Sequence, residues 1–172
     1  MTHPRCKTKY SLDGLTSIFR YDGIIKQAVK TLKYRRVTNL AQEFISLIPL
    51  ENFPKSSLFL PIPLHPSRYR DRGFNQAEVL GRHLAERLHV PMRIDILKRV
   101  IKTTPQVEMK DRKERLDNMK GVFALHHDAC LLSHETFILF DDVFTTGATM
   151  RAAGETLKRA GAKSVWAITM AR

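Results

Sequence analysis

The sequence predicts an α/β fold built on a doubly wound, mostly parallel sheet, and three features of the chain support this prediction. Short apolar segments of strand length alternate with longer segments whose apolar residues recur at helical spacing. Such alternation is typical of strand–helix–strand units, whose helices cover both faces of a parallel sheet. Carboxylates and hydroxyls follow one strongly apolar segment, and ligands of such sheets bind at the carboxyl ends of the strands. The length of 172 residues suits one domain with a sizeable core.

The first half of the chain contains elements that apolar spacing and proline positions predict. In chain order we expect a strand at 15–21, helices at 24–32 and 40–48, and a strand at 58–63. We expect residues 65–74, which include several arginines and Gly73, to form a loop. Asn75 followed by Glu78 resembles a capping box, so a helix is predicted to begin there and to end before Pro91.

The second half contains one polar segment and several apolar ones. Residues 98–120 alternate basic and acidic side chains and are too polar for a core element, so we expect a mobile segment there. The other expected elements are a solvated helix at 111–119, strands at 122–125 and 137–140, a helix at 150–160 and a strand at 164–170. Gly161 is the expected C-cap of the last helix.

Composition excludes several classes of protein. No apolar run approaches the ~20 residues that a membrane-spanning helix needs, and the basic N-terminus has no apolar segment of a signal peptide. Two cysteines, Cys6 and Cys130, do not make a disulfide framework. We therefore expect a cytoplasmic protein without membrane insertion.

The net charge of +12 is distributed unevenly. Residues 1–37 carry nine Lys and Arg against two acids, and residues 93–115 carry eight against four. A solubilising surface, neutralisation of an anionic substrate and attraction of nucleic acid each account for such an excess. The sequence leaves these three interpretations open.

Residues 137–149 carry the clearest chemical signal. Four apolar residues precede Asp141 and Asp142, and a hydroxyl-rich turn around Gly147 follows. A strand, a loop of small residues and a helix N-terminus form a phosphate site, because unpaired N–H groups and the positive end of the helix dipole point into the loop. The residues expected to bind the phosphate are Thr145, Thr146, Gly147, Ala148 and Thr149.

The two adjacent carboxylates separate this loop from commoner phosphate-binding loops. Neither Gly-x-x-x-x-Gly-Lys-Ser/Thr nor Gly-x-Gly-x-x-Gly is present. Two acids repel a phosphate unless a ribose intervenes, whose hydroxyls donate to the carboxylates while its 5′-phosphate reaches the threonines. The segment resembles the 5-phosphoribosyl-1-pyrophosphate (PRPP) signature of type I phosphoribosyltransferases, although Phe144 is bulkier than the usual aliphatic residue. A buried strand that ends in an acidic turn is the alternative.

Two further segments resemble the ComF/GntX-like competence proteins of that family. Residues 61–78 contain Arg-Gly-Phe-Asn-Gln-Ala, the most specific part, and 104–106 begins a second matching block. The likeness covers roughly residues 18–172. Members commonly carry a four-cysteine zinc module before this region, whereas only Cys6 precedes it here. We therefore expect a zinc-less or N-terminally shortened form.

A second group of residues whose side chains can bind zinc lies in an expected loop. The group is either a zinc site or part of a solvated polar loop. Its members are His126, His127, Cys130 and His134.

The resemblance implies a protein that binds PRPP with Mg²⁺, without direct metal ligation by the protein. Asp141 and Asp142 would hold the ribose hydroxyls and stabilise positive charge at C1′. Candidate pyrophosphate contacts are Arg68, Arg70 and Arg72, and candidate lid residues are Lys110, Arg112 and Arg115. Solvated arginines and a surface helix are the alternatives for these two groups.

In phosphoribosyltransferases a separate hood selects the acceptor base, and only the N-terminal helices could supply one here. We accordingly expect a small helical hood in residues 1–55 and a phosphoribosyltransferase-like α/β core in residues 56–172, within one compact unit.

The resemblance also implies a role in natural competence and DNA uptake, with single-stranded DNA and competence machinery proteins as partners. Tyr34, beside Arg35 and Arg36, is the more plausible aromatic contact, whereas Phe19 is expected in the core. Three functions stay open: a ComF-like competence protein with or without phosphoribosyl transfer, a nucleobase-salvage phosphoribosyltransferase, and a non-catalytic PRPP-sensing scaffold.

Overall fold

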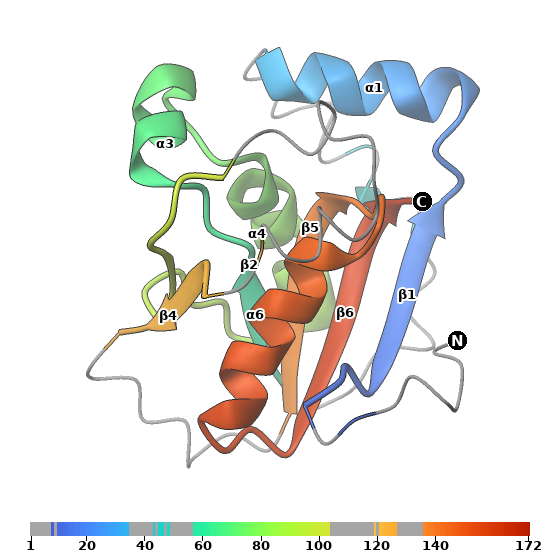
Figure 1. Ribbon diagram of the computed structural model, residues 1–172. Helices are drawn as coiled ribbons and strands as arrows, with labels where there is room; N and C mark the ends of the chain where they lie inside the picture. The colour runs from blue at the N-terminus through green and yellow to red at the C-terminus, as the bar shows by residue number, and fades with distance from the viewer. Residues whose placement is uncertain are drawn as a thin grey trace.

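A four-stranded parallel sheet forms the centre of the computed structural model (Figure 1). The structure describes residues 8, 10–34, 43, 45–46, 48, 57–103, 119, 121–126 and 136–172. In spatial order the strands are β1 (Gly14–Phe19), β6 (Ser164–Ala171), β5 (Thr136–Val143) and β2 (Ser57–Pro61). A separate antiparallel pair is formed by β3 (Leu97–Arg99) and β4 (Phe123–Leu125). The expected α/β fold with a mostly parallel sheet is confirmed.

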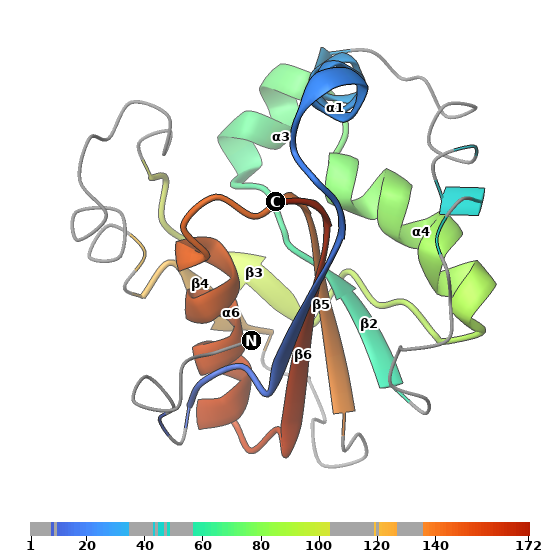
Figure 2. The same cartoon turned by 90° about the vertical axis from the view of Figure 1, so that its right-hand side faces the viewer.

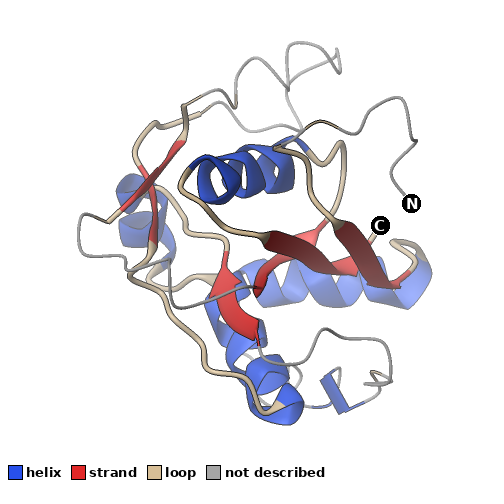
Figure 3. Ribbon diagram, turned by 90° about the horizontal axis from the view of Figure 1, so that it is seen from below, coloured by secondary structure: helices blue, strands red, loops and turns tan. Residues whose placement is uncertain are grey.

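Helices cover both faces of this sheet (Figure 2). They are α1 (Gly23–Tyr34), α3 (Pro66–Arg72), α4 (Gln76–Leu88) and α6 (Ala148–Arg159). Helices α4 and α6 lie on opposite faces, and α1 and α3 lie beyond the carboxyl ends of the strands (Figures 1 and 2). Seen from below, the β3–β4 pair lies apart from the main sheet (Figure 3). No helix in the described ranges is both long enough and apolar enough to cross a membrane.

Strand alternation divides the core into two parts, because successive side chains of a strand point to opposite faces. The face toward α6 buries Leu58, Leu60, Phe137, Leu139, Val165 and Ala167 with Met150, Ala153 and Leu157. The face toward α4 buries Phe59, Ile138, Phe140 and Ile168 with Leu80 and Leu84. Both central strands are thus apolar on both faces, which is typical of a parallel sheet between two helical layers.

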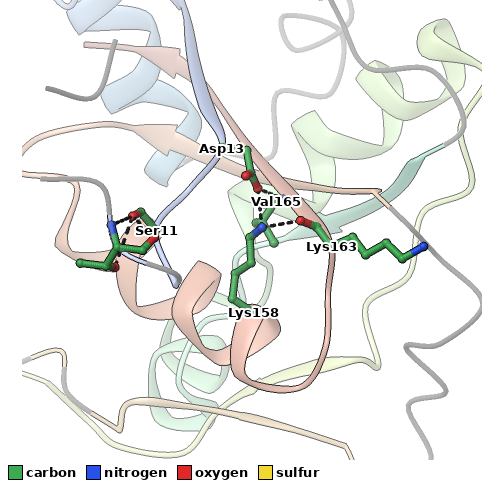
Figure 4. A network of polar contacts seen from close by, with 6 residues as sticks. Ser11, Asp13, Lys158, Lys163 and Val165 are labelled. Atoms are coloured by element: carbon green, nitrogen blue, oxygen red, sulfur yellow. Dashed lines mark hydrogen bonds and ion pairs between the residues drawn. The ribbon is translucent and has the colours of Figure 1, made fainter. Parts of the chain in front are cut away.

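An ion pair at the amino edge of the sheet fixes β1 beside β6 (Figure 4). The Asp13 carboxylate accepts a hydrogen bond from the Val165 N–H at 2.7 Å, and its Oδ2 lies 2.7 Å from Lys158 Nζ. Lys158 also donates to the Lys163 carbonyl at 2.5 Å. Residues before the expected boundary at 55 therefore contribute an edge strand to the same sheet as residues after it.

Three expectations about the elements were wrong in detail. Residues 66–72 form α3 instead of a loop, because His65 caps its N-terminus, Pro66 suits the first turn, and Gly73 ends it at φ 75°. Residues 97–99 form a strand although the segment is polar, since β4 supplies its partner. Strand β5 also continues through both aspartates to Val143. The helices expected at 40–48 and 111–119 lie largely outside the described residues.

Candidate functional site

The site predicted from sequence lies at the carboxyl edge of the sheet, where β5 leads through a short loop into α6. Parallel pairing brings the carboxyl end of β5 beside those of β2 and β6. The Ile62 N–H donates to the Phe140 carbonyl at 2.8 Å, so the chain leaving β2 toward α3 starts directly beside Asp141. The first residues of α3 and the acidic end of β5 thus belong to one edge.

The two aspartates are both half-buried, but they are not equivalent. Because β5 continues through them, strand alternation directs Asp141 to the α6 face and Asp142 to the α4 face. The Asp142 N–H donates to Asp141 Oδ1 at 2.9 Å, which orients the Asp141 carboxylate. A sugar at this edge could therefore meet one carboxylate from each side of the strand.

The loop after β5 depends on Gly147, which caps α6 at φ 76° and ψ 7°. A Cβ at this position would lie 2.4 Å from Cζ of Phe144, so both the backbone conformation and the space require glycine. Ala148 is 1% exposed and belongs to the core. Its N–H donates to Thr146 Oγ1 at 3.4 Å, which ties the start of α6 to the loop.

The remaining loop threonines reach solvent to different extents. Thr145 is exposed, and Thr146 and Thr149 are half-buried. The expected phosphate loop is therefore a turn whose hydroxyls border solvent and whose glycine and alanine pack inward. A loop of this kind, followed by a helix N-terminus, can hold an anion through N–H and O–H donors.

Phe144 supports the loop from below, and this explains the bulky residue noted in the sequence. Its N–H donates to the Ala171 carbonyl at 2.8 Å, and its ring packs beneath Gly147. The Arg172 guanidinium lies 5.3 Å from the centre of the same ring. An exposed cation thus lies beside the loop, in a cation–π contact that the sequence did not predict.

The three arginines predicted to bind pyrophosphate lie on α3, with Arg68 and Arg72 on one face and Arg70 on the other. Arg68 donates to the Thr103 carbonyl at 2.9 Å, and Arg72 donates to Gln76 Oε1 at 3.2 Å. Arg70, two positions from each, lies on the opposite side of the helix and is exposed. Within the described residues, Arg68 is the one of the three that hydrogen-bonds to the β3 side of the site, at Thr103.

Arg99 is a site residue that the sequence analysis did not single out. Its Nη2 donates to Thr103 Oγ1, and its guanidinium lies 5.6 Å from the centre of the Phe123 ring. Burial lowers the pKa of the Arg99 guanidinium, the positive charge of Arg68 lowers it further, and the negative charge of Asp141 raises it. Arg99 therefore lies within electrostatic range of both residues. Its sequence signal is weak: Arg99 lies two residues after Leu97, so the two would share one face of a strand. That strand has three residues and is too short to predict from sequence.

Asn75 confirms the predicted helix start and also ties α4 to β2. It is 2% exposed; its Oδ1 accepts from the Ala77 N–H at 3.1 Å, and its Nδ2 donates to the Ile62 carbonyl at 3.0 Å. Nδ2 also donates to Glu78 Oε1 at 3.1 Å, so the glutamate reaches the side chain of the cap. The Asn of the Arg-Gly-Phe-Asn-Gln-Ala stretch therefore positions the edge of the site.

Several predicted residues lie outside the described part of the chain. They are the lid candidates Lys110, Arg112 and Arg115, the zinc candidates His127, Cys130 and His134, and Arg35 and Arg36. Within the described ranges, no group of three or more His, Cys, Asp or Glu side chains could hold a metal ion.

Comparison with known proteins identifies the family. The model of the phosphoribosyl transferase domain matches residues 75–172, which include both aspartates and the Gly147 loop. Competence protein F of Haemophilus influenzae is 33% identical over 113 residues, which cover 66% of this chain and 49% of that protein. Competence protein ComFC of Streptococcus pneumoniae is 30% identical over 157 residues, covering 91% of this chain and 67% of that protein.

A third relative, DNA utilization protein YhgH of Escherichia coli O157:H7, is 28% identical over 159 residues, covering 88% of this chain and 68% of that protein. The chain thus spans about half of the first relative and about two thirds of the other two. The acidic strand end, the glycine loop and these matches agree, and the chain belongs to the phosphoribosyl transferase family as a ComF-like member.

Proposed function

We propose that this chain binds PRPP at the carboxyl edge of the sheet and transfers its phosphoribosyl group to an acceptor. The observation that carries the proposal is the continuous run from the Asp141–Asp142 pair at the end of β5, through the Gly147 turn, to the N-terminus of α6. This run offers acceptors for ribose hydroxyls next to donors for a 5′-phosphate, in the order in which ribose 5-phosphate presents those groups.

The chemistry of transfer suits these residues. A bond forms between C1′ and the nucleophilic atom of the acceptor while the bond from C1′ to pyrophosphate breaks, and pyrophosphate leaves with the bonding electrons. Positive charge develops on the ribose during this step, and the Asp141 and Asp142 carboxylates would stabilise it. Arg68, at the same edge, would contact the departing pyrophosphate.

Magnesium fits the donors at this edge. Carboxylate oxygens are ligands that Mg²⁺ accepts, and it usually retains water and substrate phosphate oxygens alongside one or two carboxylates. The half-buried Asp141 and Asp142 could supply those carboxylates through water bound to the ion, without direct ligation. Bound with PRPP, the ion would neutralise the charge of the pyrophosphate group.

Release of pyrophosphate from Mg–PRPP, measured with a panel of purine and pyrimidine bases, tests whether transfer occurs. We expect release that depends on one class of acceptor and that falls at least about a hundredfold in Asp141→Asn, because mutations that remove transition-state electrostatics have effects of that size. Binding of PRPP without release under any acceptor would reject transfer and support the sensing scaffold.

A role in DNA uptake or utilisation is the second part of the proposal. It is supported by relatives whose names are competence protein and DNA utilization protein, and by the net charge of +12. Single-stranded DNA and competence machinery proteins are the proposed partners, and a cytoplasmic location stays a prediction. Binding of labelled single-stranded DNA across a salt series tests the DNA contact, since phosphate contacts make affinity fall steeply with salt. No binding at low salt would reject it.

A further inference from the structure

Helix α3 begins at an N-cap that can take up a proton. The cap is His65, whose backbone is extended, and its Nδ1 accepts a hydrogen bond from the Ser67 N–H at 3.2 Å. Ser67 Oγ lies 2.8 Å from the same nitrogen. Serine, threonine, aspartate and asparagine are the usual residues at this position, and their capping oxygens accept a hydrogen bond throughout the neutral range. Histidine differs from them because its charge ordinarily changes between about pH 5 and 8.

The cap requires the neutral ring of His65 in one tautomer. A backbone N–H can only donate, so Nδ1 must carry a lone pair and the ring proton must be on Nε2. The Ser67 hydroxyl then donates to the same lone pair. When the ring takes up a proton, Nδ1 becomes a donor. The hydroxyl can turn to accept from it, but the Ser67 N–H loses its acceptor.

Helix α3 depends on its caps more than the longer helices do. It has seven residues, and none of them is buried. Most of the stability of a helix in a protein comes from packing of an apolar face, and a helix this short is marginal without it. Pro66, at the start of α3, has no N–H to satisfy, so the Ser67 N–H is the first donor that needs an acceptor. Loss of the His65 cap therefore destabilises the first turn of α3.

The charge of a protonated His65 acts in the same direction, because a cation is unfavourable at a helix N-terminus. The charged side chains on α3 and on the neighbouring elements are Arg68, Arg70, Asp71 and Arg72 on α3, Glu78 on α4, Arg99 on β3, and Asp141 and Asp142 on β5. Nearby carboxylates favour the protonated ring and guanidinium groups disfavour it. Their balance sets the pH at which His65 takes up a proton, but not the effect of that proton on the cap. The other histidines among the described residues are His83, His89 and His126, and none of them lies on α3.

We propose that His65 is a positioning residue whose protonation loosens α3 and so weakens the binding of Mg–PRPP as the pH falls. The inference rests on the proposed function, and it does not require His65 to touch the ligand. Arg68 ties α3 to the segment after β3, since it donates to the Thr103 carbonyl at 2.9 Å. A first turn that leaves its helical conformation would therefore move side chains at the edge where PRPP is proposed to bind. The contribution of the cap is present while His65 is neutral and is lost as the pH falls and the ring takes up a proton.

Calorimetric titration of Mg–PRPP into the full chain at about pH 6 and about pH 8 tests the effect on binding. His65→Asn keeps a capping oxygen that does not titrate, whereas His65→Ala removes the cap at both pH values. At the higher pH we expect the Asn variant to bind within about twofold of the wild type and the Ala variant about fivefold more weakly, the factor that one N-cap is worth. At the lower pH the Asn variant should bind about threefold more tightly than the wild type, which has lost most of its cap. Protonation of PRPP itself affects every variant alike, so the affinities are compared at the same pH.

His89→Asn is the matched control. It makes the same exchange at an exposed histidine that ends α4 at φ 53°, a conformation that asparagine tolerates. This variant should follow the wild type at both pH values. Proton–nitrogen NMR spectra of the histidine rings read the tautomer without any ligand. With His65→Asn used to assign its signals among the seven histidines, the His65 ring should carry its proton on Nε2 at about pH 8.

Three results would reject the proposal. The first is an affinity ratio of His65→Asn to the wild type that is the same at both pH values. The second is an equal gain in His89→Asn at the lower pH, and the third is a neutral His65 ring that carries its proton on Nδ1. These results leave the proposed function intact, provided that the wild type binds PRPP. A wild type that binds no PRPP at either pH would reject the proposed function and the effect on binding, whereas the NMR spectra would still show whether His65 caps α3 in the inferred tautomer.

Discussion

Gly147 shows how a single residue at the edge of the sheet combines two constraints. Its φ of 76° is strained for any other L-residue, and a Cβ would meet the Phe144 ring at 2.4 Å. The sequence motif predicted the glycine and its loop. It could not predict the ring beneath it, because that contact depends on β6, which holds the Phe144 N–H through Ala171.

We expect Gly147→Ala to cost about 1–3 kcal/mol of stability and to weaken ribose 5-phosphate binding at least tenfold, since the loop must leave its conformation. Gly161→Ala is the control. Gly161 also has a positive φ, 104°, but it lies at the other end of α6, and a Cβ there would meet no described atom within 4 Å beyond its chain neighbours. Its variant should lose stability yet keep the wild-type affinity; equal loss of affinity in both variants would show that strain alone, not loop geometry, affects binding.

The orientation of the aspartate pair and the position of Arg99 could not be predicted from the sequence. The motif predicted Asp141 and Asp142 as a pair, but not that the strand continues through them and turns them to opposite faces. The position of Arg99 could not be predicted, because its contact with Thr103, which Arg68 also contacts, exists only in the fold.

Among the elements, the central ones were predictable because their apolar patterns are strong. The strands at 136–143 and 164–171 and the helices at 76–88 and 148–159 follow the expected segments within a few residues. Helix α3 was missed because its seven residues include no apolar stripe. Its signals were the capping residues His65 and Gly73, which also suit a loop.

Strand β1 is an edge strand whose position depends on Asp13. The Lys158 side chain is 8% exposed. Removal of the Asp13 carboxylate would therefore leave a mostly buried ammonium group without its ion-pair partner. We expect Asp13→Ala to lower the free energy of unfolding by about 1–3 kcal/mol, because the Val165 N–H also loses its acceptor.

Urea unfolding measures this effect. Glu155→Gln is the control, because it breaks an exposed ion pair with Arg159 and should leave the midpoint unchanged. An unchanged midpoint in Asp13→Ala as well would mean that β1 does not depend on this carboxylate.

At the scale of the whole molecule, the parallel sheet brings distant segments of the chain to one edge. The carboxyl ends of β1, β2 and β5 lead into α1, α3 and the Gly147 loop, so basic, acidic and hydroxyl side chains gather where ligands of such folds bind. Fold class and family could be predicted from the alternation of elements and from the motifs. The acceptor could not, since no short motif encodes it.

Calorimetric titration of Mg–PRPP tests the central claim most directly. We expect the wild type to bind one equivalent, and Asp141→Asn and Asp142→Asn each to weaken binding about tenfold or more, because each removes an acceptor for the ribose. Asp71→Asn, an exposed carboxylate on α3, is the control and should bind as the wild type does. Absence of binding by the wild type, or wild-type affinity in both site variants, would contradict the account.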